Sequence, residues 1–91
     1  MKGRVTGTAF NELLEIHSYI AKEDDAAARL VRSRVEELIE RIFEFPFIAP
    51  AVNDVGVRVF PVRPFPYLIF YTVTQREVII RNVRYAGRMR P

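Results

Sequence analysis

The sequence predicts an α+β fold in which an antiparallel helix hairpin packs on one face of a small antiparallel β-sheet. Three observations support this fold class. Apolar residues recur at helical spacing in the first half of the chain, strand-like runs replace them after residue 56, and the connections between these runs are short. With 91 residues, of which 49% are apolar, the chain has the size and composition of one domain covering residues 1–91.

The first half of the chain predicts two helices. The stretch AFNELLEIHSYIAKE, residues 9–23, carries one apolar stripe, and Thr8 is a suitable N-cap for it. The acidic turn KEDD ends this helix and supplies Asp24 or Asp25 as the cap of a second helix over about residues 26–44. The second helix has a continuous apolar seam at Ala27, Val31, Val35, Leu38, Ile42 and Phe45. Because the break between the helices is so short, we expect an antiparallel hairpin.

The second half predicts a loop followed by three strands. Pro46, Pro50 and Gly56 exclude further helix and indicate a loop. The runs VRVFPVR, PYLIFYTV and EVIIRNVRY are then joined by short connections, so an antiparallel meander is the natural topology. Pro61 places the first of these strands at an edge or a bulge. The opening MKGRVT is typical of a short edge strand, whose pairing partner stays open.

The composition excludes several classes of function. The chain has no cysteine, which excludes a disulfide framework, a Cys-ligated zinc site and a thiol nucleophile. A single histidine cannot build a His-rich metal site, and no metal or other cofactor is expected. No apolar run approaches the roughly 18 residues of a membrane span, so we expect a cytoplasmic protein.

Charge is divided unevenly along the chain. Residues 10–45 hold five basic and nine acidic residues, a net charge of −4. Residues 46–91 hold seven arginines and two acidic residues, a net charge of +5. Because arginine suits phosphate and carboxylate groups, an anionic partner is expected for the second half. Charge alone leaves open whether that partner is nucleic acid or an acidic protein segment.

Two features of the helices have structural interpretations. His17 borders the apolar stripe of the first helix without an implied partner, which favours a packing histidine over a general base. The acidic side of the second helix, Glu36, Glu37, Glu40 and Glu44, has arginines one turn away. Pairs such as Arg32–Glu36 and Glu37–Arg41 predict a solvated, salt-bridged face.

The last strand carries the most informative polar residues. Strict alternation places Arg81 and Tyr85 on one face, and Arg58 or Arg63 from the first strand of the meander could lie beside them. If the helices cover the other face, these side chains point into an open concavity. Such a set could hold a phosphate and stack a base, or it could bind carboxylates of a partner peptide. Alternatively, the arginines only keep an open sheet face soluble.

Three stretches, in this order along the chain, carry a family resemblance. They are TAFNELLEIHSYIAKEDDAAARLVRSRVEELI, GVRVFPVRPFPYLIFYTV and VIIRNVRYAGRMRP. They resemble the ParE toxins of the RelE/ParE superfamily, the toxin halves of bacterial toxin–antitoxin pairs. The first is similar to the family's first helix, acidic turn and Ala-rich start of the second helix, the second to its hairpin, and the third to its closing strand with an Arg–x–x–x–His–x–x–Arg ending. Tyr85 stands where many members have histidine.

The resemblance implies a toxin that inhibits bacterial growth and is neutralised by a cognate ParD-like antitoxin. The C-terminal segment of such an antitoxin is disordered when free and wraps the toxin in a hetero-oligomeric complex. ParE-type members bind DNA gyrase and block replication without being enzymes, and this is the leading expectation. RelE-type members cleave mRNA on the ribosome, and this alternative would use Arg58, Arg81 and Tyr85 as catalytic residues. Arg58, Arg81, Tyr85 and Arg88 match positions that carry function in one branch or the other.

Overall fold

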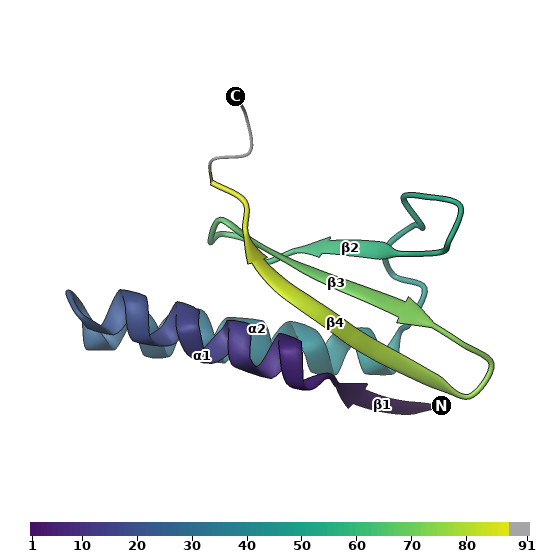
Figure 1. Ribbon diagram of the computed structural model, residues 1–91, viewed down its shortest axis with the longest axis horizontal. Helices are drawn as coiled ribbons and strands as arrows, with labels where there is room; N and C mark the ends of the chain where they lie inside the picture. Colours follow the sequence, from purple (N-terminus) through teal and green to yellow (C-terminus); the bar gives the residue numbers. More distant parts are fainter. Residues whose placement is uncertain (88–91) are drawn as a thin grey trace.

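Two helices and four strands make up the fold, which a computed structural model describes for residues 1–87 (Figure 1). The elements in chain order are β1 (Lys2–Val5), α1 (Gly7–Ala21), α2 (Asp25–Glu44), β2 (Arg58–Pro61), β3 (Tyr67–Val73) and β4 (Glu77–Tyr85). The α+β fold class, the helix hairpin and the three-stranded meander predicted from the sequence are thereby confirmed. None of the helices within residues 1–87 is long and apolar enough to cross a membrane.

Both helices begin at a side-chain cap. The Oγ1 atom of Thr6 accepts a hydrogen bond of 3.0 Å from the N–H of Ala9, so α1 begins two residues before the position expected from Thr8. Asp24 caps α2 in the same way, accepting a bond of 3.0 Å from the N–H of Ala27. These caps satisfy N–H groups that the helices leave without an intrahelical partner.

The sheet is mixed because its first strand joins it in parallel. The strand order is β1-β4-β3-β2, with antiparallel pairing between β2 and β3 and between β3 and β4. Strand β1, whose partner the sequence left open, pairs in parallel with β4. Within residues 1–87, this is the one parallel pair of the sheet. Strand β2 is at the other edge, where Pro61 breaks no ladder. Gly3 lets β1 approach α2, since a Cβ atom there would lie 2.4 Å from the ring of Phe43.

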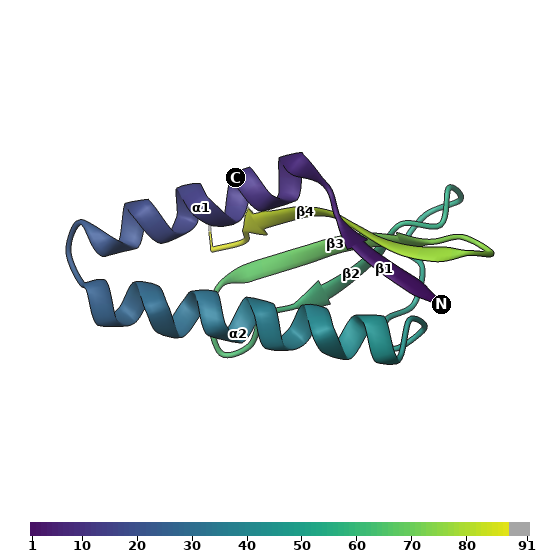
Figure 2. The ribbon, with the colours of Figure 1, turned by 90° about the horizontal axis from the view of Figure 1, so that it is seen from below.

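The helices cover one face of the sheet and diverge from their connecting turn toward β1 (Figure 2). Between them and the sheet lies the core, in which the predicted seam of α2 takes part through its four central members. The buried core includes Leu13, Val31, Val35, Leu38, Ile42, Ile69, Tyr71, Val78, Ile80 and Val83. The last member of the predicted seam, Phe45, is 57% exposed because α2 ends at Glu44 and the chain turns away there.

A β-bulge in β4 decides which side chains face the helices. Phe70 of β3 pairs with Asn82, but the next residue, Tyr71, pairs with Ile80, so Arg81 has no partner in β3. The alternation of β4 therefore inverts at Arg81. Ile80 and Val83 are both buried against the helices, although strict alternation would place them on opposite faces. The carbonyl of Arg81 accepts a hydrogen bond of 3.2 Å from the Thr6 hydroxyl, which ties the bulge to the start of α1.

Candidate functional site

Arg81 and Tyr85 lie on opposite faces of the sheet, so the prediction that they share one face was wrong. The Nε atom of Arg81 donates a hydrogen bond of 3.0 Å to the hydroxyl of Thr72. Thr72 follows the buried Tyr71 in β3 and so lies on the open face. Tyr85 pairs with Tyr67, whose ring is buried on the helix side, and the two ring centroids are 5.6 Å apart. The extra residue of the bulge causes this separation.

Arg58 is also on the helix-covered side, where it holds the loop that follows α2. Its guanidinium donates to the carbonyl of Ala49 and lies 4.9 Å from the ring centroid of Phe47. Tyr71, its partner in β3, binds the same loop: its hydroxyl donates to the carbonyl of Pro46 at 3.0 Å and accepts from the N–H of Ala49 at 3.3 Å. Burial raises the pKa of Tyr71, while the N–H of Ala49 and the charge of Arg58 act in the opposite direction.

The two remaining predicted site arginines do not join this set. Arg63 is exposed in the connection between β2 and β3, and its carbonyl accepts a bond of 2.9 Å from the Nε atom of Arg34 on α2. Arg88 lies outside the residues that the structure describes. Arg58, Arg81 and Tyr85 therefore have three different surroundings, and the expected concavity lined by all of them is not formed.

The polar side chains of the helices do not gather into a metal-binding group within residues 1–87. No group of three or more His, Asp or Glu side chains there could hold a metal ion. His17 is half-buried on α1, and its Nδ1 atom has no hydrogen-bond partner among these residues. The acidic side of α2 is salt-bridged as expected, with Arg32 and Glu36 3.2 Å apart. Glu37, however, pairs with Arg34 at 3.1 Å instead of with Arg41.

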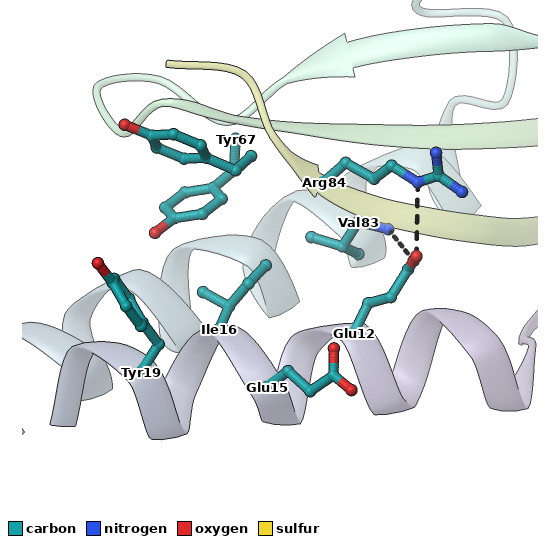
Figure 3. A pocket seen from close by; sticks show the side chains of 8 residues that line it. Glu12, Glu15, Ile16, Tyr19, Tyr67, Val83 and Arg84 are labelled. Carbon is teal, nitrogen blue, oxygen red and sulfur yellow. Dashed lines mark hydrogen bonds and ion pairs between the residues drawn. The ribbon is translucent and has the colours of Figure 1, made fainter. Parts of the chain in front are cut away.

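A pocket with a volume of about 740 Å³ lies between α1, the start of β3 and the end of β4 (Figure 3). Three of its lining residues are tyrosines: Tyr19 from α1, Tyr67 from β3 and Tyr85 from β4. In Figure 3 the ring of Tyr19 rises from α1 toward the strands, beside Ile16. Burial raises the pKa of Tyr67, and the nearby hydroxyls of Tyr85 and Tyr19 add to this shift. The three tyrosines thus form one cluster, which we call the tyrosine pocket.

Glu12 connects α1 to the edge of β4 beside this pocket. Its carboxylate accepts hydrogen bonds from the backbone N–H of Val83 at 2.9 Å and from the Nδ2 atom of Asn82 at 3.2 Å. It also pairs with the Nε atom of Arg84 at 3.4 Å (Figure 3). Strand β1 pairs with β4 only as far as Ile80, so Glu12 satisfies an N–H that the sheet leaves open.

A second, more apolar groove of about 420 Å³ opens where the two helices diverge. Val5 and Phe10 at its mouth are 40% and 49% exposed, and the acidic Glu36 and Glu40 lie along it. Its other lining residues are Ala9, Leu13, Ile39, Phe43 and Val83. We call this the interhelix groove. It is suited to an amphipathic segment of another chain, since apolar surface of this kind commonly marks interaction sites.

Neither the tyrosine pocket nor the role of Glu12 was predicted from the sequence. The sequence did carry a partial signal for the pocket. Alternation places Tyr67 on the same face of its strand as the apolar Ile69 and Tyr71, and Tyr19 belongs to the apolar stripe of the first helix. The position of Tyr85 depends on the bulge, for which the sequence carries no recognised signal. Glu12 was one of many helical acids, and only the packing of α1 along β4 distinguishes it.

Comparisons with known proteins agree on one group. Residues 4–90 match the family model described as "ParE toxin of type II toxin-antitoxin system, parDE". The chain is 34% identical over 89 residues to "Putative toxin Y4kP" of Sinorhizobium fredii (strain NBRC 101917 / NGR234), an alignment that covers 97% of this chain and 91% of that protein. A solved structure titled "Chromosomal ParDE TA system from P. aeruginosa" has the same fold. The TM-score is 0.83 with 19% identity, over 96% of this chain and 97% of that one.

Proposed function

Because the chain belongs to the ParE toxin family of type II toxin–antitoxin systems, we propose that it arrests bacterial growth by binding DNA gyrase and blocking replication. In this proposal the toxin acts in the cytoplasm as a binding protein. A cognate ParD-like antitoxin neutralises it by forming a hetero-oligomeric complex. The alternative is a ribosome-dependent mRNA endoribonuclease, as in the RelE branch of the superfamily.

The dispersal of Arg58, Arg81 and Tyr85 is the observation that favours binding over RNA cleavage. A ribonuclease needs its acid, its base and its phosphate-binding group within hydrogen-bonding reach of one scissile phosphate. Here Arg58 is bonded to the loop after α2, and Arg81 is bonded to Thr72 on the open face. Tyr85 lines the tyrosine pocket on the helix side. A toxin that acts by surface recognition needs no such convergence.

For the antitoxin we propose contacts on both sides of the molecule. An apolar part of its C-terminal segment fills the interhelix groove, where Val5 and Phe10 are exposed. Acidic residues of the same segment pair with Arg81, an exposed arginine of β4. Both contacts fit a segment that folds as it wraps the toxin, because it gains apolar burial and ion pairs together.

The proposal is tested by incubating the purified chain with gyrase and relaxed plasmid, and in parallel with ribosomes translating a defined message. We expect loss of supercoiling at toxin concentrations that leave the message intact, and restored supercoiling when the antitoxin is added first. Arg81→Ala should weaken inhibition several-fold. Arg76→Ala, an exposed arginine in the turn before β4, is the matched control and should not. Cleavage of the message at codon positions with unaffected supercoiling would establish the endoribonuclease instead.

A further inference from the structure

The tyrosine pocket has aromatic walls supplied by three separate elements. Tyr67 and Tyr85 are directly opposite in the β3–β4 ladder, and their rings are tilted by 58° with centroids 5.6 Å apart. Tyr67 is 8% exposed, whereas Tyr85 and Tyr19 are 56% and 74% exposed. One ring is therefore fixed inside the protein, and two rings leave their surfaces open to an incoming group.

Of the three charged side chains that line this pocket, Glu12 and Arg84 are paired with each other and Glu15 is not. Glu12 is occupied by the N–H of Val83, by Asn82 and by Arg84, so the positive charge of Arg84 is already paired. Glu15 also lines the pocket and is exposed, and its carboxylate makes no hydrogen bond or ion pair with any residue among 1–87. The balance of two carboxylates and one guanidinium leaves a single unpaired negative charge at the pocket.

The chemistry of the lining selects a cation with an apolar stem. The faces of tyrosine rings attract cations, and a planar guanidinium stacks on such a face more readily than an ammonium group does. Ile16, which is partly exposed, provides apolar surface for a methylene chain. A tyrosine phenol is protonated at neutral pH, and burial raises the pKa of Tyr67 further, so the ring faces and Glu15, not a phenolate, supply the attraction.

We propose that the tyrosine pocket receives an arginine side chain from a partner protein. The guanidinium stacks on the exposed rings of Tyr19 and Tyr85, its stem packs on Ile16, and Glu15 supplies the opposite charge. The inference does not depend on gyrase as the target, because it concerns the chemical group that is bound. If the chain bound arginine in this pocket but left gyrase active, the proposed function would fail and the arginine site would stand.

The pocket is tested by nuclear magnetic resonance, titrating the full chain with N-acetyl-arginine-methylamide. The neutral isostere N-acetyl-citrulline-methylamide and the acidic N-acetyl-glutamate-methylamide are titrated in parallel. The chain has four tyrosines, and the fourth, Tyr71, is fully buried and serves as an internal control. We expect saturable shifts of the ring signals of Tyr19, Tyr67 and Tyr85 with the arginine compound. Citrulline should bind about two- to fivefold more weakly, as the loss of a cation–π contact at exposed rings implies.

Two variants connect the binding to named residues. Glu15→Gln should weaken arginine binding about two- to fivefold, the range for an exposed ion pair, whereas Glu23→Gln, an exposed acid after α1, should leave it unchanged. Tyr85→Leu should weaken it further. If Tyr85→Leu lowers the folded fraction, Glu15→Gln still tests the proposal, because Glu15 is exposed and its substitution leaves the fold intact. Equal affinity for arginine and citrulline, preference for the glutamate compound, or absence of shifts at the three tyrosines would overturn the proposal.

Discussion

At the scale of single residues, one unpaired position in β4 determines where the candidate groups point. Arg81 has no partner in β3, so every later side chain of β4 is on the face opposite to the one strict alternation predicts. Tyr85 consequently joins Tyr67 and Tyr19, and Arg81 stays with Thr72 on the open face. Arg81 and Tyr85 therefore belong to two different surfaces.

This separation predicts that Arg81→Ala and Tyr85→Ala affect the free energy of antitoxin binding independently, because no single group of the antitoxin reaches both side chains. Residues that share no partners usually have additive effects, within roughly 0.3–0.5 kcal/mol. Arg81→Ala, Tyr85→Ala and the double variant should therefore give additive losses of binding free energy when measured by calorimetry. A coupling well above that range would mean that both side chains contact the same group of the antitoxin.

Glu12 is expected to be the most important carboxylate for stability. Removing it in Glu12→Ala leaves the N–H of the buried Val83 without a partner and frees Arg84. We predict a loss of about 1–3 kcal/mol in the free energy of unfolding, measured by urea denaturation. Glu15→Ala, on the same helix and without partners among residues 1–87, should change it by less than about 0.5 kcal/mol. Similar losses for both variants would contradict this role of Glu12.

At the scale of elements, the loop after α2 is held in place from the sheet. The hydroxyl of Tyr71 bonds to Pro46 and Ala49, and Arg58 bonds to Ala49 and stacks on Phe47. The loop connects the last turn of α2 to the first residue of β2. These contacts therefore fix the path of the loop between α2 and the edge strand β2. Arg58, which the sequence placed in a binding site, instead stabilises this loop.

Tyr71→Phe should destabilise the protein near neutral pH by about 1–3 kcal/mol, because it leaves a buried N–H and a carbonyl without their partner. Its effect should shrink at alkaline pH. Burial raises the pKa of Tyr71, so the folded state keeps the phenol proton that the unfolded state loses above about pH 10. The wild type therefore loses stability as pH rises through that range, and the variant loses less. Urea denaturation across this pH range measures the free energy of unfolding of the wild type and of the variant. A difference between them that does not change with pH would contradict a raised pKa for Tyr71.

At the scale of the whole molecule, the sequence predicted the architecture much better than the site. Regular apolar spacing and short connections determine the helix hairpin and the meander, because these depend on local periodicity. The parallel pairing of β1 with β4 joins residues about 75 positions apart, and no local pattern specifies it. The bulge at Arg81 is also a product of tertiary packing. Since side-chain direction in β4 depends on it, the predicted set of Arg58, Arg81 and Tyr85 could not be placed correctly from alternation alone.

The uneven division of charge along the chain corresponds to a division between helices and strands in the structure. The acidic first half supplies the helices, and the arginine-rich second half supplies three of the four strands. An antitoxin segment that wraps both therefore meets acidic residues along the interhelix groove and arginines on β4. This arrangement agrees with a toxin whose action depends on surface recognition.

Whether the chain acts by binding gyrase is decided by measuring the equilibrium binding of the full chain to intact gyrase. Biolayer interferometry with immobilised gyrase is suitable, with translating ribosomes as the competing target. We expect saturable binding to gyrase, prevented by prior addition of the antitoxin, and no saturable binding to ribosomes. Binding to ribosomes without binding to gyrase, at concentrations that arrest growth, would instead identify the ribosome as the target.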